Sequence, residues 1–444
     1  MHLAKFNVDL YLTKKRERKA SKRSHLLKLR QKACARATTY NSAKRGIFGG
    51  KSAIANLLCK SANKQISLNQ TSLRLNVPSK FSMLTSPEAA LELICSFALT
   101  HQKQVISDIY IDFSAVISQD LGAHALLDKL VDEMVLQTKV QNSHVGWKGT
   151  FPNDPAQRRF IAAMGVVSQL GLSRRYLNNS EEKKIHRFER KCRHYVRALK
   201  PIKPEDKSEQ ANAAERFADH VNTCLASEGR ALSNEGRSKL CTYVAEIIDN
   251  AECHAGMVDW TIQGYVDMAM DEPECEIVIF NFGKSIAETF EDMPLESYPR
   301  VQIQKYLDIH TNSGWFSHKW RSKDLLTLIA LQGSVSTKNE SEFHTRGQGT
   351  ADLIQFFQQM NDERELVNHK PASMYIISGS TKVIFDPKYK IVHSDDGSRI
   401  IAFNDSNDLN LPPDQTCVTP LLNGCHLPGT MIGIKFAVKA AILQ

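Results

Sequence analysis

The chain has 444 residues, of which 42% are hydrophobic and 24% are charged, and it carries a formal net charge of +9. This length favours two or three domains, and the composition is that of a globular protein, which excludes collagen-like and wholly disordered chains. No run of about 18 apolar residues occurs in the sequence, so we expect no membrane-spanning segment and no membrane partner.

The beginning of the chain and the cysteines both indicate a reducing compartment. Residues 1–20 lack the apolar core and the cleavage site of a signal peptide. The ten cysteines include no CxxC pair, which argues against a secreted disulfide framework and against a structural zinc site. We therefore expect a cytoplasmic protein.

The positive charge is concentrated in the first part of the chain. Residues 1–64 contain 17 Lys or Arg and two acids, so they carry +15, and the remaining residues carry −6. We expect a basic, flexible arm over residues 1–75. Its charge is typical of a solvated arm or of a segment that neutralises nucleic-acid phosphates, so a nucleic-acid partner for residues 1–64 stays open.

Residues 76–204 have the pattern of a small α/β domain. A helix is predicted for "SPEAALELICSFALT", a strand for "SDIYIDFSAV", and a second helix for "GAHALLDKLVDEMVLQ". This order resembles the core of STAS domains, the partner fold of bacterial sigma-factor switches. The phosphorylated serine of that family is missing, because Gln119, Asp120 and Leu121 precede Gly122. A charged stretch with Pro201 and Pro204 predicts a domain boundary near residue 204.

A capped amphipathic helix is predicted at the start of residues 205–444. Ser233 can cap it and Gly256 can end it. Its apolar stripe consists of Leu240, Val244, Ile247, Ile248 and Ala251. Glu246 and Asn250 are four residues apart, so they lie one turn from each other on a face beside that stripe.

Two strands, "DWTIQGYVDMA" and "CEIVIFNFG", are predicted to follow this helix. The second strand continues into "FNFGKSI", a long irregular segment comes next, and "RGQGTADLI" then begins another helix. A last strand contains "PGTMIGIKF". Two glycine-rich turns that flank a long segment are typical of a nucleotide site.

These motifs resemble those of the GHKL ATPase superfamily, which includes DNA gyrase, heat-shock chaperone ATPases and histidine kinases. "EIIDNA" resembles its N box, "FNFGKSI" and "RGQGTADLI" its two glycine boxes, and "PGTMIGIKF" its closing Gly-Thr strand. The resemblance implies an α/β (α+β) fold in which residues 205–444 form a two-layer α/β sandwich. It also implies binding of ATP and Mg²⁺.

The resemblance assigns a role to each motif residue. Glu246 would activate the attacking water, and Asn250 would bind Mg²⁺. Asn281 stands where the family has an Asp that recognises adenine, which leaves the base preference open. The other nucleotide-binding positions would be Gly283, Arg346, Gly347, Gly349 and Thr430. Residues 287–345, with His310, Trp315, Trp320 and Arg321, would form a lid or contact a partner.

The sequence therefore predicts an ATP-binding regulatory protein, a slow ATPase whose lid closure gates contact with a protein partner. Two alternatives stay open. One is a protein serine kinase of the anti-sigma-factor type, and the other is a nucleic-acid-binding protein with a degenerate ATPase scaffold. A homodimer is also left open.

Overall fold

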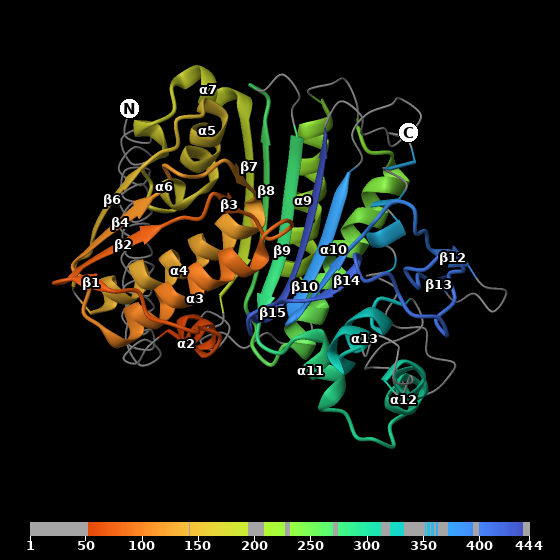
Figure 1. Cartoon of the computed structure of the whole chain (residues 1–444). Helices are drawn as coiled ribbons and strands as arrows, with labels where there is room; N and C mark the ends of the chain where they lie inside the picture. The colour runs from red at the N-terminus through yellow and green to blue at the C-terminus, as the bar shows by residue number, and fades with distance from the viewer. Residues whose placement is uncertain are drawn as a thin grey trace, which may run out of the picture. The chain divides into compact units, whose positions relative to one another are not determined.

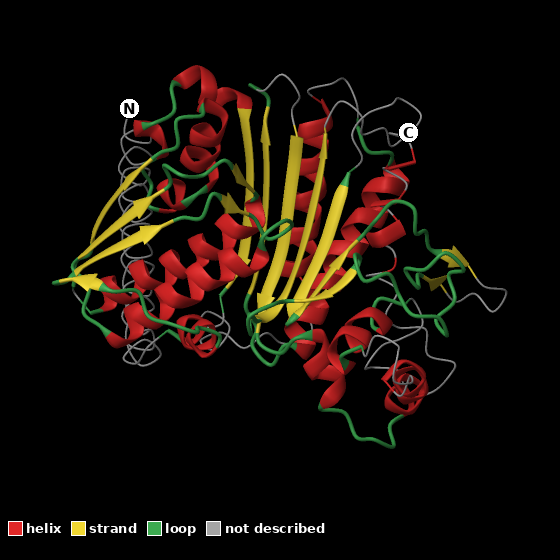
Figure 2. Cartoon of the chain, in the orientation of Figure 1, coloured by secondary structure: helices red, strands yellow, loops and turns green. Residues whose placement is uncertain are grey.

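A computed structural model describes residues 52–193 except 142, 208–226, 231–269, 274–311, 320–332, part of 351–362, 372–393 and 399–437. Figures 1 and 2 show the mixed α/β architecture that was predicted. Residues 1–51, which hold most of the predicted basic arm, lie outside the described residues. Within the described part, no helix has both the length and the apolar character that a membrane span needs.

The first sheet has four strands in the order β1-β2-β4-β6, with β2, β4 and β6 parallel to one another. Its strands are β1 (Leu68–Asn69), β2 (Ser72–Asn76), β4 (Asp108–Asp112) and β6 (Gly146–Thr150). The short strands β3 (Lys80–Phe81) and β5 (Ser118–Gln119) pair beside it. The helices of this region are α2 (Ala53–Lys60), α3 (Pro87–Lys103), α4 (Leu121–Val140), α5 (Pro155–Met164), α6 (Val166–Gln169) and α7 (Asn179–Lys184).

The predicted arm over residues 1–75 is wrong in its last third. Residues 53–76 include α2, β1 and β2, and the side chains of Ile54, Ala55 and Leu58 are buried in the core. The basic residues that suggested an arm lie mostly before residue 52, whereas α2 is mainly apolar. The strand and helices predicted for the STAS-like segment are confirmed as α3, β4 and α4.

The second sheet has seven antiparallel strands in the order β14-β11-β10-β15-β9-β8-β7. They are β7 (Ile185–Cys192), β8 (Trp260–Asp267), β9 (Glu274–Phe282), β10 (Ser373–Gly379), β11 (Thr381–Ile384), β14 (Val418–Pro420) and β15 (Leu427–Ala437). A small hairpin, β12 (Val392–His393) and β13 (Arg399–Ile400), lies outside it.

Strand β7 was not predicted, and it belongs to the second sheet although it precedes the domain boundary predicted near residue 204. The predicted boundary is therefore wrong. Residues 185–192 were assigned to a charged stretch between domains, but all eight pair with β8. Phe188 and Cys192 of β7 are buried against the helices of the second sheet, and Lys191 pairs with Asp132 of α4. The pairing of Lys191 with α4 is a tertiary contact, which the sequence pattern could not show.

The segment after β9 is more regular than predicted. Three helices, α11 (Ile286–Glu291), α12 (Tyr298–Thr311) and α13 (Ser322–Ile329), lie in the part that was expected to be irregular. Ser285 caps α11 in a reciprocal arrangement with Glu288. The residues between these helices and β10 are described only in part.

Helices cover both faces of the seven-stranded sheet. Helices α9 (Ser208–Ala226) and α10 (Asn234–His254) pack on one face. Helix α4 packs on the other face and contacts β8, β9 and β15 (Figure 1). One hydrophobic core therefore includes both the first sheet and the back of the second, which the prediction of two separate domains did not anticipate.

Helix α4 carries charged side chains into this interface. The Lys129 ammonium lies 2.9 Å from Asp259 and 3.6 Å from Glu133, and all three side chains are at most 2% exposed. Burial opposes the charge of Lys129, but the two carboxylates outweigh burial and hold the pKa of Lys129 above its ordinary value. At the start of α4, Leu121 N donates to the carboxylate of Glu276 in β9 at 2.7 Å.

A buried histidine lies in the same layer. His124 of α4 is fully buried and its ring contacts Phe81, Phe113 and Phe160. Its Nε2 lies 2.8 Å from Gln119 Oε1. Burial lowers the pKa of His124 to about 3, because the apolar surroundings disfavour the charged ring.

Removal of the buried ammonium should destabilise the protein strongly. We expect Lys129→Met to lower the free energy of unfolding by about 3–5 kcal/mol, because Asp259 and Glu133 would remain buried without their cation. Chemical denaturation should show this loss, and Lys129→Met/Asp259→Asn should recover part of it. The matched control is Lys148→Met, which breaks an exposed pair with Asp108 and should cost less than about 1 kcal/mol. Equal losses for Lys129→Met and Lys148→Met would contradict the role of the buried pair.

His124 should make stability depend on pH. The pKa of His124 is lower in the folded state than the ordinary value of 6.5. Between pH 6.5 and 3 His124 is therefore protonated in the unfolded chain but not in the folded one, and the free energy of unfolding decreases as the pH is lowered. At pH 5 this amounts to about 2 kcal/mol relative to pH 7.5. The loss measured by denaturation between pH 7.5 and 5 should be smaller by this amount in His124→Phe. If wild type and variant lose the same free energy, His124 is not buried as a neutral ring.

Candidate functional site

Helix α10 has the cap and the apolar stripe that the sequence predicts. Ser233 Oγ accepts a hydrogen bond from Gly236 N at 3.0 Å, and the helix ends at His254, just before Gly256. The stripe residues Leu240, Val244, Ile247 and Ile248 are all buried. Glu246 and Asn250 lie on this helix one turn apart, and their side chains lie outside what the structure describes.

The first glycine turn lies directly against the end of α10. Lys284 N donates to the carbonyl of Ala255, the C-terminal cap of the helix, at 2.8 Å. Gly283 has a φ of +123°, and a Cβ at this position would lie 1.9 Å from the same carbonyl oxygen. Only glycine permits this backbone conformation and this close approach.

The closing Gly-Thr segment meets the same turn from the other side. Gly283 N donates to the Pro428 carbonyl at 3.2 Å. Gly429, with a φ of +138°, lies so close to β9 that a Cβ would be 2.0 Å from the carbonyl oxygen of Asn281. The C-terminal end of α10, the first glycine turn and the Gly-Thr segment, which are far apart in the sequence, therefore come together at one end of the sheet.

A row of polar side chains crosses the sheet at this end. Asn281 of β9 lies opposite Thr430 of β15, and Thr430 lies opposite Ser378 of β10. Thr430 Oγ1 and Ser378 Oγ are 2.7 Å apart. We call Asn281, Thr430 and Ser378 the polar row. On its other side, Asn281 lies opposite Trp260 of β8.

The polar row faces the helices α9 and α10. Ile277 and Ile279 of β9 belong to the core on that face, and side chains two residues apart in a strand point to the same side, so Asn281 does as well. The same alternation places Thr430 with Ile432 and Ile434. The row therefore continues an apolar surface with hydrogen-bonding groups, an arrangement suited to the edge of a flat heterocycle.

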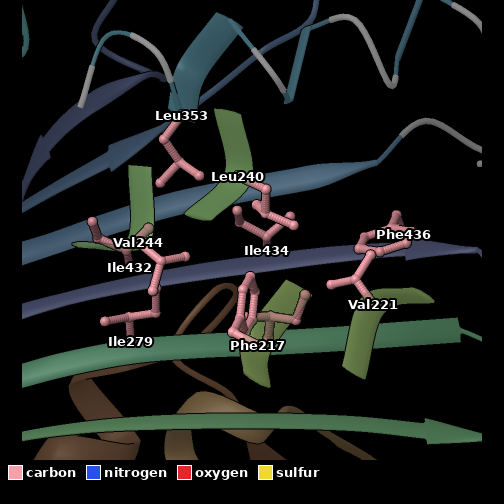
Figure 3. Close-up of a pocket in the computed structure, with 10 residues that line it drawn as sticks. Phe217, Val221, Leu240, Val244, Ile279, Leu353, Ile432, Ile434 and Phe436 are labelled. Atoms are coloured by element: carbon pink, nitrogen blue, oxygen red, sulfur yellow. The ribbon is translucent and has the colours of Figure 1, made fainter. Parts of the chain in front are cut away.

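The apolar part of this surface encloses only a small cavity (Figure 3). The cavity holds about 20 Å³, roughly the space of one water molecule. Its lining has no polar side chain and consists of Phe217, Val221, Leu240, Val244, Ile277, Ile279, Leu353, Ile432, Ile434 and Phe436. A nucleobase does not fit there, so a ligand of this site would lie at the polar row.

The remaining predicted residues divide into two groups. Arg346, Gly347 and Gly349, from the second glycine box, lie outside the described residues, as does Trp315. His310, Trp320 and Arg321 are described, and each has a role inside the protein. The ring of His310 lies 2.8 Å from the Leu409 carbonyl, Trp320 is 6% exposed, and Arg321 donates to Asp324 and to the Ser380 carbonyl.

Sequence reasoning did not identify Ser378, Trp260 and Asp259 as part of this region. Ser378 and Trp260 reach the row only through strand register, which a sequence does not reveal. Asp259 connects the turn to α4, because its carbonyl accepts from Phe282 N at 3.3 Å and its carboxylate binds Lys129. In the sequence, the available signal for a role of Asp259 was its position directly before an alternating strand.

Comparisons of the chain with protein-family models, with curated proteins and with solved structures found no match. The resemblance to GHKL ATPases therefore stays a prediction from the sequence motifs.

Gly283 should be far less tolerant of a side chain than Gly256. We expect Gly283→Ala to lower the free energy of unfolding by about 3 kcal/mol or more, because the methyl group would meet the Ala255 carbonyl. Gly256→Ala is the matched control: its φ is also positive, +71°, but a Cβ there has no atom within 4 Å, so the cost should be about 1 kcal/mol. Thermal and chemical denaturation of both variants would test this, and similar costs would contradict the tight contact at Gly283.

Proposed function

We propose that residues 205–444 bind Mg-ATP between α10 and the polar row, and that the protein is an ATP-dependent regulator. The observation that carries this proposal is the meeting of the N-box helix, the first glycine turn and the Gly-Thr segment at one end of the sheet. Lys284 N on the Ala255 carbonyl and Gly283 N on the Pro428 carbonyl join the three segments.

The polar row supplies the contacts that a base needs. The Asn281 side chain can accept a hydrogen bond from an exocyclic amino group through its oxygen and can donate one through its nitrogen. Thr430 shares a hydrogen bond with Ser378. Ser378 is buried and also accepts from Ile286 N at 2.8 Å, so Thr430 is the hydroxyl that would meet a water or a ring nitrogen. Because Asn281 can do both, this site would discriminate less sharply between purines than an Asp would.

Helix α10 supplies the phosphate end of the proposed site. An amide oxygen of Asn250 together with phosphate and water oxygens is the kind of ligand set that Mg²⁺ takes. Mg²⁺ would neutralise the phosphate charge. Glu246, one turn earlier, would orient and deprotonate the attacking water.

Asp259 gives the proposed site a route to the first sheet. It contacts Phe282, next to Asn281, through its backbone and Lys129 of α4 through its side chain. The interface with α4 is a continuous buried core, so movement of the first sheet and its helices away from the second sheet would expose this core to water. We infer that nucleotide binding acts on this interface through small shifts at Asp259 rather than through separation of the two sheets.

Nucleotide binding by the purified protein tests this proposal. We expect Mg²⁺-dependent ATP binding by calorimetry, and a loss of about 10- to 100-fold in affinity for Asn281→Ala, which removes the base contact. Asn281→Asp should bind ATP and discriminate more strongly against GTP. Asn250→Ala should lose the dependence on Mg²⁺, and Glu246→Ala should bind ATP without hydrolysing it.

Lys284→Ala is the matched control, because Lys284 is in the same turn but is exposed and paired with Asp292; its affinity should equal that of the wild type. Labelled γ-phosphate that appears as inorganic phosphate would support an ATPase, and label on a protein serine would support the kinase alternative. Absence of ATP binding by the wild type would overturn the proposal.

A further inference from the structure

A second cluster of ligand atoms lies in the same helical layer, away from the polar row. His220 and Cys224 are four residues apart on α9, so they share one face of that helix. Cys275 of β9 lies beneath them, on the face of the sheet that packs against α9. The three side chains are 7%, 1% and 0% exposed.

The ligand atoms of this cluster are spaced like those around a metal ion. The imidazole nitrogen of His220 and the sulfur atoms of Cys224 and Cys275 all lie within 4.8 Å of one another. Cys224 Sγ lies 3.7 Å from His220 Nε2. Bonds of about 2.3 Å to sulfur and 2.05 Å to nitrogen, at a tetrahedral angle, separate these two atoms by about 3.6 Å.

The surroundings hold the imidazole in place. The His220 ring stacks on Phe188 of β7 with the ring centres 5.4 Å apart. Gly264 of β8 leaves the space for it, since a Cβ there would lie 2.7 Å from His220 Nε2. Any residue larger than glycine at 264 would push the nitrogen away from the two sulfur atoms.

The donor set selects the kind of ion. Two sulfurs and one imidazole are soft or borderline ligands, and the cluster has no oxygen donor, which excludes Mg²⁺ and Ca²⁺. Two thiolates and a neutral imidazole around a divalent ion give a complex with no net charge. A neutral complex is the one that a buried, largely apolar layer tolerates best.

We propose that His220, Cys224 and Cys275 bind one Zn²⁺ ion, which fastens α9 to the seven-stranded sheet. The fourth position is left for a water or for His186, which lies on the same face of the sheet. In the strand register, Val266 of β8 lies between His186 of β7 and Cys275 of β9. This site is independent of the proposed ATP site, because none of its residues belongs to the polar row or to α10.

Metal analysis of the full-length protein, purified under reducing conditions, tests the proposal. We expect about one zinc per chain by mass spectrometry of the metal. Cobalt(II) added to the metal-free protein should give the thiolate-to-cobalt charge-transfer band and the intense visible bands of a four-coordinate site. Zinc should displace the cobalt and abolish both signals.

Substitution of a ligand should weaken cobalt and zinc binding by at least about 100-fold in Cys224→Ser, Cys275→Ser and His220→Gln. Cys241→Ser is the matched control. It replaces a half-buried cysteine of the neighbouring helix α10, whose Sγ contacts the Ala214 carbonyl of α9, and it should bind like the wild type.

A second measurement does not require a stable variant. Zinc should slow the alkylation of Cys224 and Cys275 in the native wild type, followed by peptide mass spectrometry, and should leave the rate at Cys241 unchanged. The proposal fails if the reduced wild type binds no zinc at micromolar concentrations. It also fails if the ligand variants bind as tightly as Cys241→Ser.

Discussion

The constraint on which the rest of this structure depends is the burial of α4 against the back of the seven-stranded sheet. A sheet with helices on one face only would present the apolar side chains of β9, β10 and β15 to water. Here Leu126, Leu130 and neighbouring residues of α4 cover that face. Two charged contacts, Lys129 with Asp259 and Leu121 N with Glu276, fix the position of the helix along it. Desolvated partners of this kind tolerate little sliding, so they determine how the two sheets are arranged.

The fixed back of the sheet gives the proposed binding site on the opposite face a rigid support. The strands β8, β9, β15 and β10 are held from behind, so the side chains that end them stay in register as the polar row. Gly283 then lets its turn approach the Ala255 carbonyl at the end of α10, and Gly429 lets its turn approach the Asn281 carbonyl of β9. A side chain at either glycine would prevent this approach. A site made of residues far apart in the sequence needs both a rigid support and places where the chain can come close.

Much of this architecture could be predicted because it follows from local patterns. Caps, periodicity and turn residues predicted α3, β4, α4, α10, β8 and β9 nearly to their ends. Features decided by tertiary contacts were missed. Strand β7 includes Lys191, whose partner Asp132 lies on α4, and α2 is short and follows a basic stretch but packs into the core. Cys224 and Cys275 form a cluster without any spacing motif, because a helix and a strand bring them together only in the folded chain.

The position of α4 between the two sheets has a consequence for synthesis on the ribosome. Residues 121–140 leave the ribosome well before β9, and long before β15, the last strand that covers them. At typical rates of translation, the interval before β15 is complete is on the order of tens of seconds. During this time the Asp128, Lys129, Asp132 and Glu133 side chains keep one side of the emerging helix hydrated. The same charges that are costly to bury in the mature protein therefore favour hydration of the helix while its covering strands are still missing.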